Sequence, residues 1–330
     1  MKILITGGAG MIGSNLVRAL MAKGNHVQVV DSLWRGRREH LQFHGDHTFD
    51  MQRDFFQLDL RQPGVVENIG DGFDLIFHLA DIVAGINYVF ANEGAIFRDN
   101  ILINSNVVDS ARRLKPKGFI YVGTACSFPK ALQNTDAAIA LREEQLFPAD
   151  PESAYGWSKL MGIYETELMA RETGIKCCNL IFHNVYGSPC DFGPRSQVIP
   201  ALIRKCLRYP NEDFVVWGSG NQGRAFLHVD DVVRGLLLAM ERGWDVGPIQ
   251  IGPSHCTTIR EIAETIVRIS GKAIPIKYDD TKPEGDRSRC ADYSKAARVL
   301  GWKPEVNLED GLRQLYQWSQ TQLLAEGKPD

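Results

Sequence analysis

A tyrosine and a lysine four residues apart form the clearest chemical pattern of the sequence. Tyr155 and Lys159, in "SAYGWSKLMG", share one face if this stretch is a helix. A nearby ammonium stabilises a phenolate, so Tyr155 could remove a proton from a hydroxyl group. Thr124 ends the apolar run "GFIYVGT", and its hydroxyl could hold the same substrate oxygen. The three residues predict oxidation of an alcohol, with hydride leaving the carbon that loses the proton.

A glycine turn near the start of the chain offers a place for the hydride acceptor. "KILITGGAGMIGSNLVRALMAKG" has the pattern strand, turn, helix, with glycines spaced by three. The first glycine allows the sharp turn, the second lets a pyrophosphate approach, and the third lets the helix pack against the strand. The N–H groups at the helix start would face the phosphates. This segment predicts a dinucleotide site that includes Gly7, Gly10, Met11, Ile12 and Gly13.

The next strand, "VQVV", ends at Asp31, near the expected spacing of about twenty residues from the turn. A carboxylate there accepts a hydrogen bond from the ribose 2′-hydroxyl and repels a 2′-phosphate, which favours NAD. The arginines of "DSLWRGRREH" leave NADP open, since they could instead bind a 2′-phosphate. Further along, Asp59 and Leu60 are expected near the adenine. Leu79 and Ala80, in "HLA", are expected at the nicotinamide half.

Apolar strands must position these residues. Short β-branched runs alternate with helical patterns at residues 11–23, 94–114 and 155–173. Such alternation predicts a Rossmann-type doubly wound parallel sheet of the α/β class. After residue 185 the rhythm changes, with helices expected at 198–209, 230–242, 259–270 and 307–322. We expect an NAD-binding domain at 1–185 and a smaller α/β substrate lobe at 186–330, with a possible return of the chain to the main sheet.

Composition argues against several classes of partner. The chain has 330 residues and a net charge of −3, which gives no reason to expect nucleic acid. No apolar run is long enough to span a membrane. The start "MKILITGGAG" predicts no secretory signal, and seven cysteines without a C-x-x-C pair indicate reduced thiols in the cytoplasm. His40, His44 and His47 share a helical spacing but lie in a polar stretch, so we expect no metal.

Taken together, the motifs resemble the extended short-chain dehydrogenase/reductases of the nucleotide-sugar epimerase/dehydratase type. The resemblance covers nearly the whole chain, through "GGAGMIG", "FHLA", "TACSFP", "AYGWSK", "FHNVYG", "RAFLHVDDVV" and "LGWKP". It implies that Thr124, Tyr155 and Lys159 are catalytic and that the enzyme is a homodimer, with 94–114 and 155–173 as candidate contacts. It also implies cofactor contact by Asn100 and contact with a nucleotide diphosphate by Asn184, Arg224 and Arg287. For Arg224, the alternative is a surface ion pair with Asp230 or Asp231.

Cys126, two residues after Thr124, bears on the fate of the sugar once its C4 hydroxyl is oxidised. The 4,6-dehydratases have a carboxylate close to this position, so dehydration is disfavoured. A cysteine in "ACSFP" resembles the GDP-mannose 3,5-epimerases first and the GDP-fucose synthases second, in which it acts as acid/base. The resemblance therefore implies a GDP-hexose epimerase in which Cys126 works beside a transient ketone. The alternative is a small buried cysteine.

The second acid/base of those two families has no counterpart in this chain. Where they carry Lys or His after "N-x-Y-G", this chain has Gly193 in "HNVYGSPCDFGPRSQVIP". Cys190, Arg195 and His183 are possible substitutes. A one-site epimerase, a C4 oxidoreductase, a 4-epimerase and a non-catalytic NAD sensor therefore stay open. So do the nucleotide base, the sugar and the carbon that is inverted.

Overall fold

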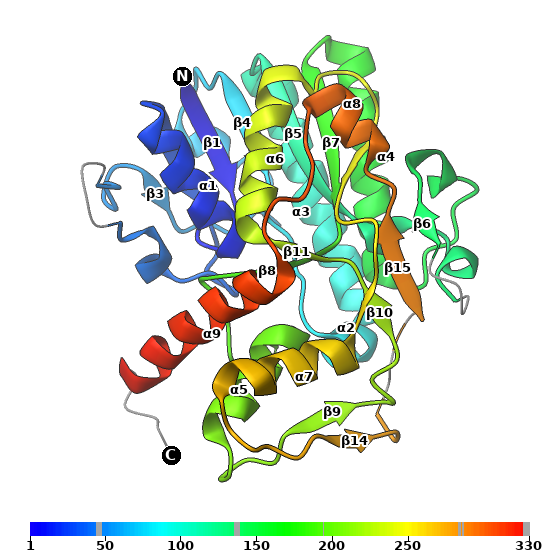
Figure 1. Cartoon of the computed structure of the whole chain (residues 1–330). Helices are drawn as coiled ribbons and strands as arrows, with labels where there is room; N and C mark the ends of the chain where they lie inside the picture. The colour runs from blue at the N-terminus through cyan, green and yellow to red at the C-terminus, as the bar shows by residue number, and fades with distance from the viewer. Residues whose placement is uncertain (44–47, 135–138, 194, 283–284, 286, 326–330) are drawn as a thin grey trace.

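A seven-stranded parallel sheet forms the centre of the molecule (Figure 1). The computed structural model describes residues 1–43, 48–134, 139–193, 195–282, 285 and 287–325. The strand order is β12-β7-β5-β4-β1-β2-β3. In chain order these strands are β1 (Lys2–Thr6), β2 (His26–Val30), β3 (Phe55–Phe56), β4 (Leu75–His78), β5 (Gly118–Thr124), β7 (Lys176–Phe182) and β12 (Ile249–Ile251).

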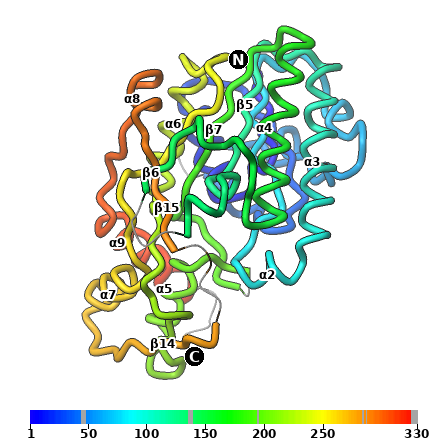
Figure 2. Tube along the Cα trace, turned by 90° about the vertical axis from the view of Figure 1, so that its right-hand side faces the viewer, coloured from blue at the N-terminus to red at the C-terminus, as the bar shows by residue number. Residues whose placement is uncertain are grey.

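Helices cover both faces of this sheet. Side chains alternate along each strand, so Ile3 and Ile5 pack on one face and Leu4 on the other. The first face is covered by α1 (Met11–Ala22), α6 (Val229–Arg242) and α8 (Ser294–Leu300). The second face is covered by α3 (Glu93–Leu114) and α4 (Ala154–Thr173), which lie side by side in Figure 2. The predicted doubly wound α/β fold is confirmed.

The strand order reverses between β1 and β4. In a doubly wound sheet, ligands bind at the carboxyl ends of the strands beside such a reversal. Figure 1 shows these ends pointing toward α5 (Val198–Arg208) and α7 (Ile259–Ser270), which lie below the sheet. The topology therefore places a binding crevice between the sheet and these helices.

The remaining elements build the lower part of the molecule and its connections. They are α2 (Ile86–Ala91), β6 (Ala140–Leu141), β8 (Asn184–Tyr186), β9 (Val215–Trp217), β10 (Gly223–Arg224), β11 (Phe226–His228), β13 (Thr257–Thr258), β14 (Lys277–Asp279), β15 (Ser288–Ala291) and α9 (Leu308–Ala325). Five short 3-10 helices, η1 (Arg38–Leu41), η2 (Glu67–Ile69), η3 (Ala125–Ser127), η4 (Lys130–Leu132) and η5 (Glu143–Leu146), complete the described part. A separate apolar core joins α5, α7 and α9.

The chain does return to the main sheet, because β12 pairs with β7 and α6 and α8 pack beside it. The division at residue 185 stays a prediction. The adjacent Cys177 and Cys178 are both buried, on opposite faces of β7. Among the described helices, none has the length and apolar character to cross a membrane.

Candidate active site

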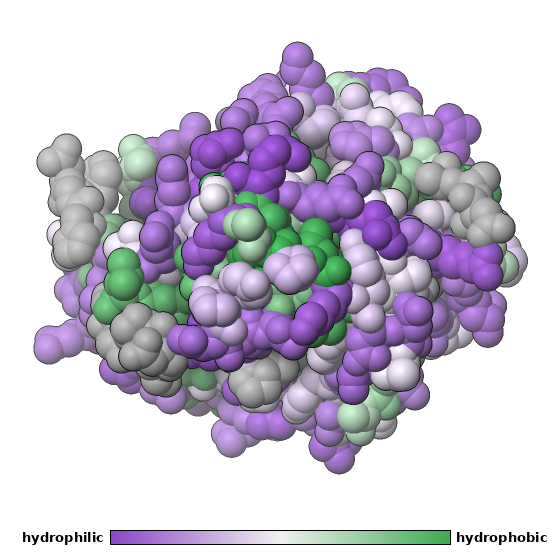
Figure 3. Space-filling view, turned by 60° about the horizontal axis from the view of Figure 1, so that its bottom comes forward, coloured by the Kyte–Doolittle hydropathy of each residue, from purple (hydrophilic) through white to green (hydrophobic). Residues whose placement is uncertain are grey.

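A cavity of about 790 Å³ lies at the carboxyl ends of the strands and continues between the sheet and the lower helices. Figure 3, with the bottom of the molecule turned forward, shows apolar side chains near the middle of this face within a mostly hydrophilic surround. Most of the sequence-predicted site residues line the cavity: Gly7, Gly10, Met11, Ile12, Gly13, Asp31, Asp59, Leu60, Leu79, Ala80, Thr124, Cys126, Tyr155, Asn184 and Arg224.

The glycine turn leaves no room for side chains. Gly7 has a φ of +72°, and a Cβ there would lie 2.9 Å from Cα of Ala80, two residues after the end of β4. A Cβ on Gly13 would lie 2.3 Å from the carbonyl oxygen of Gly7. The start of α1, at Met11, therefore lies directly against the turn, and no acidic side chain occupies its first helical turn. This open, electropositive cradle fits a dinucleotide pyrophosphate.

Asp31 is held at the end of β2. Its carboxylate accepts hydrogen bonds from the N–H groups of Ala9 (3.0 Å) and Leu33 (2.8 Å). Burial raises the pKa of Asp31, which these two hydrogen bonds oppose. Two nearby arginines have other partners: Arg35 donates to the carbonyl of Val83, and Arg38 donates to the side chain of Gln57. This geometry favours a free 2′-hydroxyl at Asp31 over a 2′-phosphate.

Of the three histidines with helical spacing, the structure describes only His40. The ring of His40 lies 2.8 Å from the carbonyl oxygen of Ala9, through Nδ1. His44 and His47 lie outside the described residues. No group of three metal-ligating side chains occurs in the part of the chain that the structure describes.

Two further residues were predicted to contact the cofactor, and of these Asp59 lines the cavity whereas Asn100 does not. The carboxylate of Asp59 is bound by the guanidinium of Arg61, which lowers the pKa of Asp59. Asn100 is fully buried and does not line the cavity. Its side chain accepts from the N–H of Ile82 (2.7 Å) and donates to the carbonyl of the same residue (3.2 Å). Asn100 therefore fixes the loop that follows β4.

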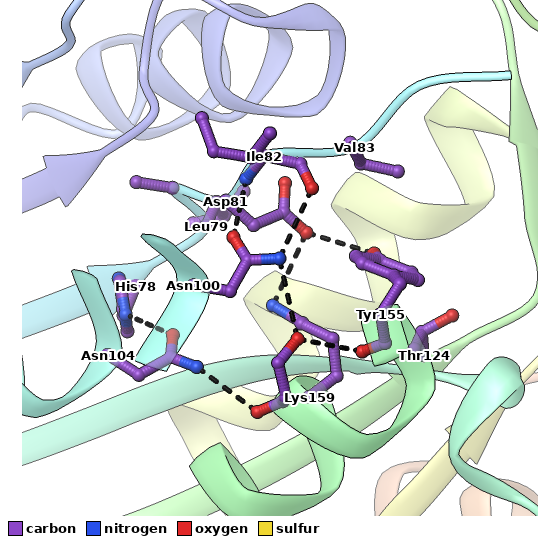
Figure 4. A network of polar contacts seen from close by, with 12 residues as sticks. His78, Leu79, Asp81, Ile82, Val83, Asn100, Asn104, Thr124, Tyr155 and Lys159 are labelled. Carbon is purple, nitrogen blue, oxygen red and sulfur yellow. Dashed lines mark hydrogen bonds and ion pairs between the residues drawn. The ribbon is translucent and has the colours of Figure 1, made fainter. Parts of the chain in front are cut away.

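Thr124, Tyr155 and Lys159 come together as predicted from β5 and α4 (Figure 4). The structure adds Asp81, which the sequence reasoning missed. The Tyr155 hydroxyl donates to Oδ2 of Asp81 at 2.9 Å, and Nζ of Lys159 lies 3.4 Å from the same oxygen. Lys159 is almost fully buried, with Nζ 4.7 Å from the ring centre of Tyr121. Burial lowers the pKa of Lys159, but Tyr121 and Asp81 outweigh burial and raise it overall.

The start of α4 is pressed against the segment that carries Cys126. The Ser153 hydroxyl caps the helix by accepting from the N–H of Gly156. A Cβ on Gly156 would lie 2.2 Å from the carbonyl oxygen of Cys126. The hydroxyl of Ser127 donates to the carbonyl of Gly156. Because glycine allows this close contact, Tyr155 and Cys126 face one cavity from two different elements.

Cys126 is half-buried, and a buried arginine accompanies it. Nη1 of Arg289 donates to Sγ of Cys126 at 3.3 Å and to the side-chain oxygen of Gln133 at 3.0 Å. The guanidinium thus places a hydrogen-bond donor against the Cys126 sulfur. The predicted Arg287 precedes β15, is exposed and does not line the cavity, whereas Arg289, on β15, does line it.

The predicted diphosphate contacts lie on short strands of the lower part. Arg224, on β10, is buried in the cavity wall, and its Nη1 donates to the carbonyl of Gly223. Asn184 begins β8, and its backbone N–H donates to the carbonyl of Ala225. Both side chains therefore border the same space as Cys126.

The candidates for a second acid/base differ in their surroundings. Gly193 lines the cavity without a side chain, and its N–H donates to the Asp191 carboxylate. Burial raises the pKa of Cys190 to about 12. Burial lowers the pKa of His183 to about 4, and its Nε2 lies 3.1 Å from the Gln250 side chain. The guanidinium of Arg195 stacks on the ring of Trp34, 4.5 Å from its centre. At neutral pH Cys190 is therefore a thiol and His183 a neutral imidazole.

A family model described as "NAD dependent epimerase/dehydratase family" matches residues 3–252. The GDP-mannose 3,5-epimerase of Arabidopsis thaliana is 32% identical over 330 residues, which cover 99% of this chain and 84% of the relative. The GDP-L-fucose synthase of Escherichia coli (strain K12) is 30% identical over 332 residues, which cover 96% of each chain. The crystal structure of UDP-glucose 4-epimerase with UDP-glucose from Thermotoga maritima has a TM-score of 0.86 and 30% identity, covering 98% of this chain and 100% of that one.

Proposed function

The chain belongs to the NAD-dependent epimerase/dehydratase family, with NAD as cofactor, and within that family we propose that it epimerises a GDP-hexose through a transient C4 ketone. The order of resemblance expected from the sequence, GDP-mannose 3,5-epimerase before GDP-fucose synthase, is confirmed. The observation that carries the finer proposal is the thiol of Cys126, which lines the cavity together with Thr124 and Tyr155.

In the proposed first step, Tyr155 receives the proton of the sugar C4 hydroxyl, while Thr124 holds the same oxygen. NAD, when bound, takes up the C4 hydrogen as hydride and later returns it. The buried ammonium of Lys159 stabilises negative charge on the oxygens around it. Proton removal by a positioned base typically accelerates such a step about 10²–10⁴-fold.

In the proposed second step, Cys126 exchanges a proton at a carbon next to the ketone. A ketone at C4 acidifies the hydrogens at C3 and C5, so a thiolate is a sufficient base. The Arg289 guanidinium supports this role, because at 3.3 Å it donates a hydrogen bond to Sγ and so holds the sulfur in the cavity wall. Proton return to the opposite face of the sugar then inverts that carbon, and hydride return at C4 completes the reaction.

The absence of a side chain at Gly193 favours an enzyme that carries out the C4 chemistry alone, without proton exchange at C3 or C5. With glycine there, the cavity wall offers no lysine or histidine opposite Cys126 at this position. A 4-epimerase or a C4 oxidoreductase needs the Tyr155 chemistry alone. The similarity to a UDP-glucose 4-epimerase structure is compatible with that alternative.

The preference for a GDP-sugar draws support from two relatives that act on GDP-sugars by name. Arg224 and Arg289 border the cavity on neighbouring strands, where their charges would pair with a diphosphate. A part in carbohydrate biosynthesis and a location in the cytoplasm follow from this proposal and stay predictions.

We also propose a homodimer through α3 and α4. Three exposed apolar side chains lie on these helices: Phe97, Leu102 and Tyr164. Phe90 of the adjoining α2 is exposed as well. Light scattering of wild type and of Phe97→Glu tests the proposal: a dimer that the substitution converts to monomer is expected, and a wild-type monomer excludes it.

A screen of GDP-, UDP-, CDP- and dTDP-hexoses tests the function. We expect new epimers from GDP-mannose or a related GDP-hexose, detected by chromatography and mass spectrometry. Tyr155→Phe should lose all turnover. Cys126→Ser should lose inversion at C3 or C5 while it still reduces the bound cofactor when sugar is added. Full turnover by Tyr155→Phe would exclude the C4 oxidation.

A further inference from the structure

A buried glutamine behind the cavity wall connects Cys126 to β15. Gln133 follows η4, is fully buried and does not line the cavity, so it does not contact a sugar bound there. Its side-chain oxygen accepts a hydrogen bond from Nη1 of Arg289 at 3.0 Å, and the same nitrogen donates to Sγ of Cys126 at 3.3 Å. Neither the oxidation at C4 nor the exchange step at Cys126 gives this glutamine a role.

Two opposed contacts fix the orientation of the Gln133 amide. Its nitrogen donates to the carbonyl oxygen of Phe128 at 2.8 Å, on the side opposite to Arg289 in hydrogen-bonding character. A carbonyl only accepts hydrogen bonds and a guanidinium only donates them. The amide nitrogen therefore belongs against Phe128 and the amide oxygen against Arg289, and a reversed amide would lose both contacts.

The backbone of Gln133 binds the same strand as its side chain. Its carbonyl oxygen accepts a hydrogen bond at 3.0 Å from the N–H of Ser288, the first residue of β15. The strand β15 is itself paired with β10, where Arg289 lies opposite Arg224. Gln133 thus joins the chain after Cys126 to β15 at two successive residues, Ser288 through the backbone and Arg289 through the side chain.

The Cys126 sulfur needs such support because its side chain turns about a single bond. The backbone is fixed, since the N–H of Cys126 donates to the Thr124 hydroxyl at 3.2 Å, but a cysteine side chain in general has three staggered positions. A donor at 3.3 Å from Sγ favours the position that the structure shows. Arg289 has a long side chain, and the Gln133 oxygen holds its Nη1 at the place from which it reaches the sulfur.

We propose that Gln133 is a positioning residue for the Cys126 step. Through Arg289 it keeps Sγ of Cys126 directed at the carbon next to the C4 ketone. The inference rests on the proposed function, because it concerns how the proton at C3 or C5 is reached. The hydrogen bonds of Gln133 described above include neither Tyr155 nor Lys159. Loss of the Gln133 side chain therefore impairs proton exchange and spares the oxidation at C4.

Gln133→Met keeps the length of the side chain and removes both polar groups, so it tests the proposal in deuterated water. With the GDP-hexose that wild type turns over, deuterium uptake at C3 or C5 should fall about 100-fold, because a shift of about 1 Å in a reacting group can cost that factor. The rate at which added sugar reduces the bound cofactor, followed by nicotinamide absorbance in a single turnover, should stay near that of wild type. The matched control is Gln28→Met, at a buried glutamine of β2 outside the cavity lining, which should leave both readouts unchanged.

Two further variants keep the test decisive. Gln133→Glu retains an oxygen that accepts from Arg289, so it should restore most of the deuterium uptake that Gln133→Met loses. Loss of uptake in Gln133→Glu to the level of Gln133→Met would contradict the proposal. If methionine prevents folding, Gln133→Asn replaces it, because its amide is one methylene shorter and its oxygen falls short of Arg289; the same loss of uptake with intact cofactor reduction is then expected.

The remaining outcomes separate this inference from the function on which it rests. An equal loss of cofactor reduction and deuterium uptake in Gln133→Met would overturn the positioning role, because it indicates a purely structural one. Labelled wild type beside an equally labelled Gln133→Met would overturn the positioning role alone. Wild type that turns over without deuterium at C3 or C5 would remove the Cys126 step of the proposed function, and the positioning role with it.

Discussion

Gly156→Ala tests how closely helix α4 must approach the Cys126 segment. The added Cβ would lie 2.2 Å from the carbonyl oxygen of Cys126 and 2.9 Å from its carbonyl carbon. Ordinary contact begins at 3.4 Å, so the two segments must separate by 3.4 − 2.2 = 1.2 Å at this point. Alanine gains about 1 kcal/mol over glycine in a helix interior. Overpacking costs about 1–3 kcal/mol, so we expect a net loss of stability of up to about 2 kcal/mol.

The effect of Gly156→Ala on activity should exceed its effect on stability. A shift of about 1 Å in a reacting group can cost about 100-fold in rate, and Tyr155 is the adjacent residue. We expect kcat to fall by that order, with urea unfolding showing only the modest loss of stability. The control is Gly94→Ala in the first turn of α3, where nothing lies within 4 Å of an added Cβ. An active and more stable Gly156→Ala variant would refute the close contact.

Three further changes probe other parts of the account. Asp31→Asn should weaken NAD binding roughly 10–100-fold and reduce discrimination against NADP, measured by calorimetry, because it removes a charged acceptor; unchanged selectivity would contradict the role of Asp31. The Cys256 thiol, whose pKa is lowered to about 7 mainly by a hydrogen bond with Cys290, should be alkylated with a pH midpoint near 7, whereas a midpoint at or above the ordinary thiol value of about 8.5 would argue against that contact. Hydrogen bonds from Ser294 and Arg142 lower the pKa of Asp292 to about 2 from its ordinary 3.8, so its charge stabilises the fold above pH 3.8 and this contribution is lost as pH falls to about 2. Asp292→Asn should therefore be less stable than wild type at pH 7 in urea unfolding and equal to it near pH 2; a constant difference would refute the assignment.

The cofactor half of the molecule was predictable from sequence because its signals are local. Gly7, Gly10 and Gly13 fall within one strand–turn–helix unit, and Asp31 ends the next strand. The hydrophobic periods of residues 11–23, 94–114 and 155–173 agree with α1, α3 and α4 within a residue at each end. The short α2, α8 and β15 lack enough length for a clear period, and the sequence analysis did not predict them.

The contacts that depend on distant segments could not be predicted in the same way. Asp81 lies 74 residues from Tyr155, and no spacing rule links a loop aspartate to that hydroxyl. Arg287 and Arg289 are two residues apart, and only the path of β15 determines that Arg289 reaches Cys126. Asn100 was expected at the cofactor, but its amide is satisfied by the backbone of Ile82. An "AYGWSK" motif gives no sign that Gly156 is required by a carbonyl 30 residues earlier in the chain.

The most direct test of the central claim is the position of deuterium in the product formed in deuterated water. With GDP-mannose, or the GDP-hexose that the screen identifies, the account predicts deuterium at C3 or C5, where Cys126 exchanges a proton. It predicts none at C4, because the hydride returns from the cofactor. Cys126→Ser should remove the label at C3 and C5. Turnover with no deuterium at either carbon would contradict a role for Cys126 in proton exchange and would favour a 4-epimerase, while deuterium at C4 would contradict hydride return.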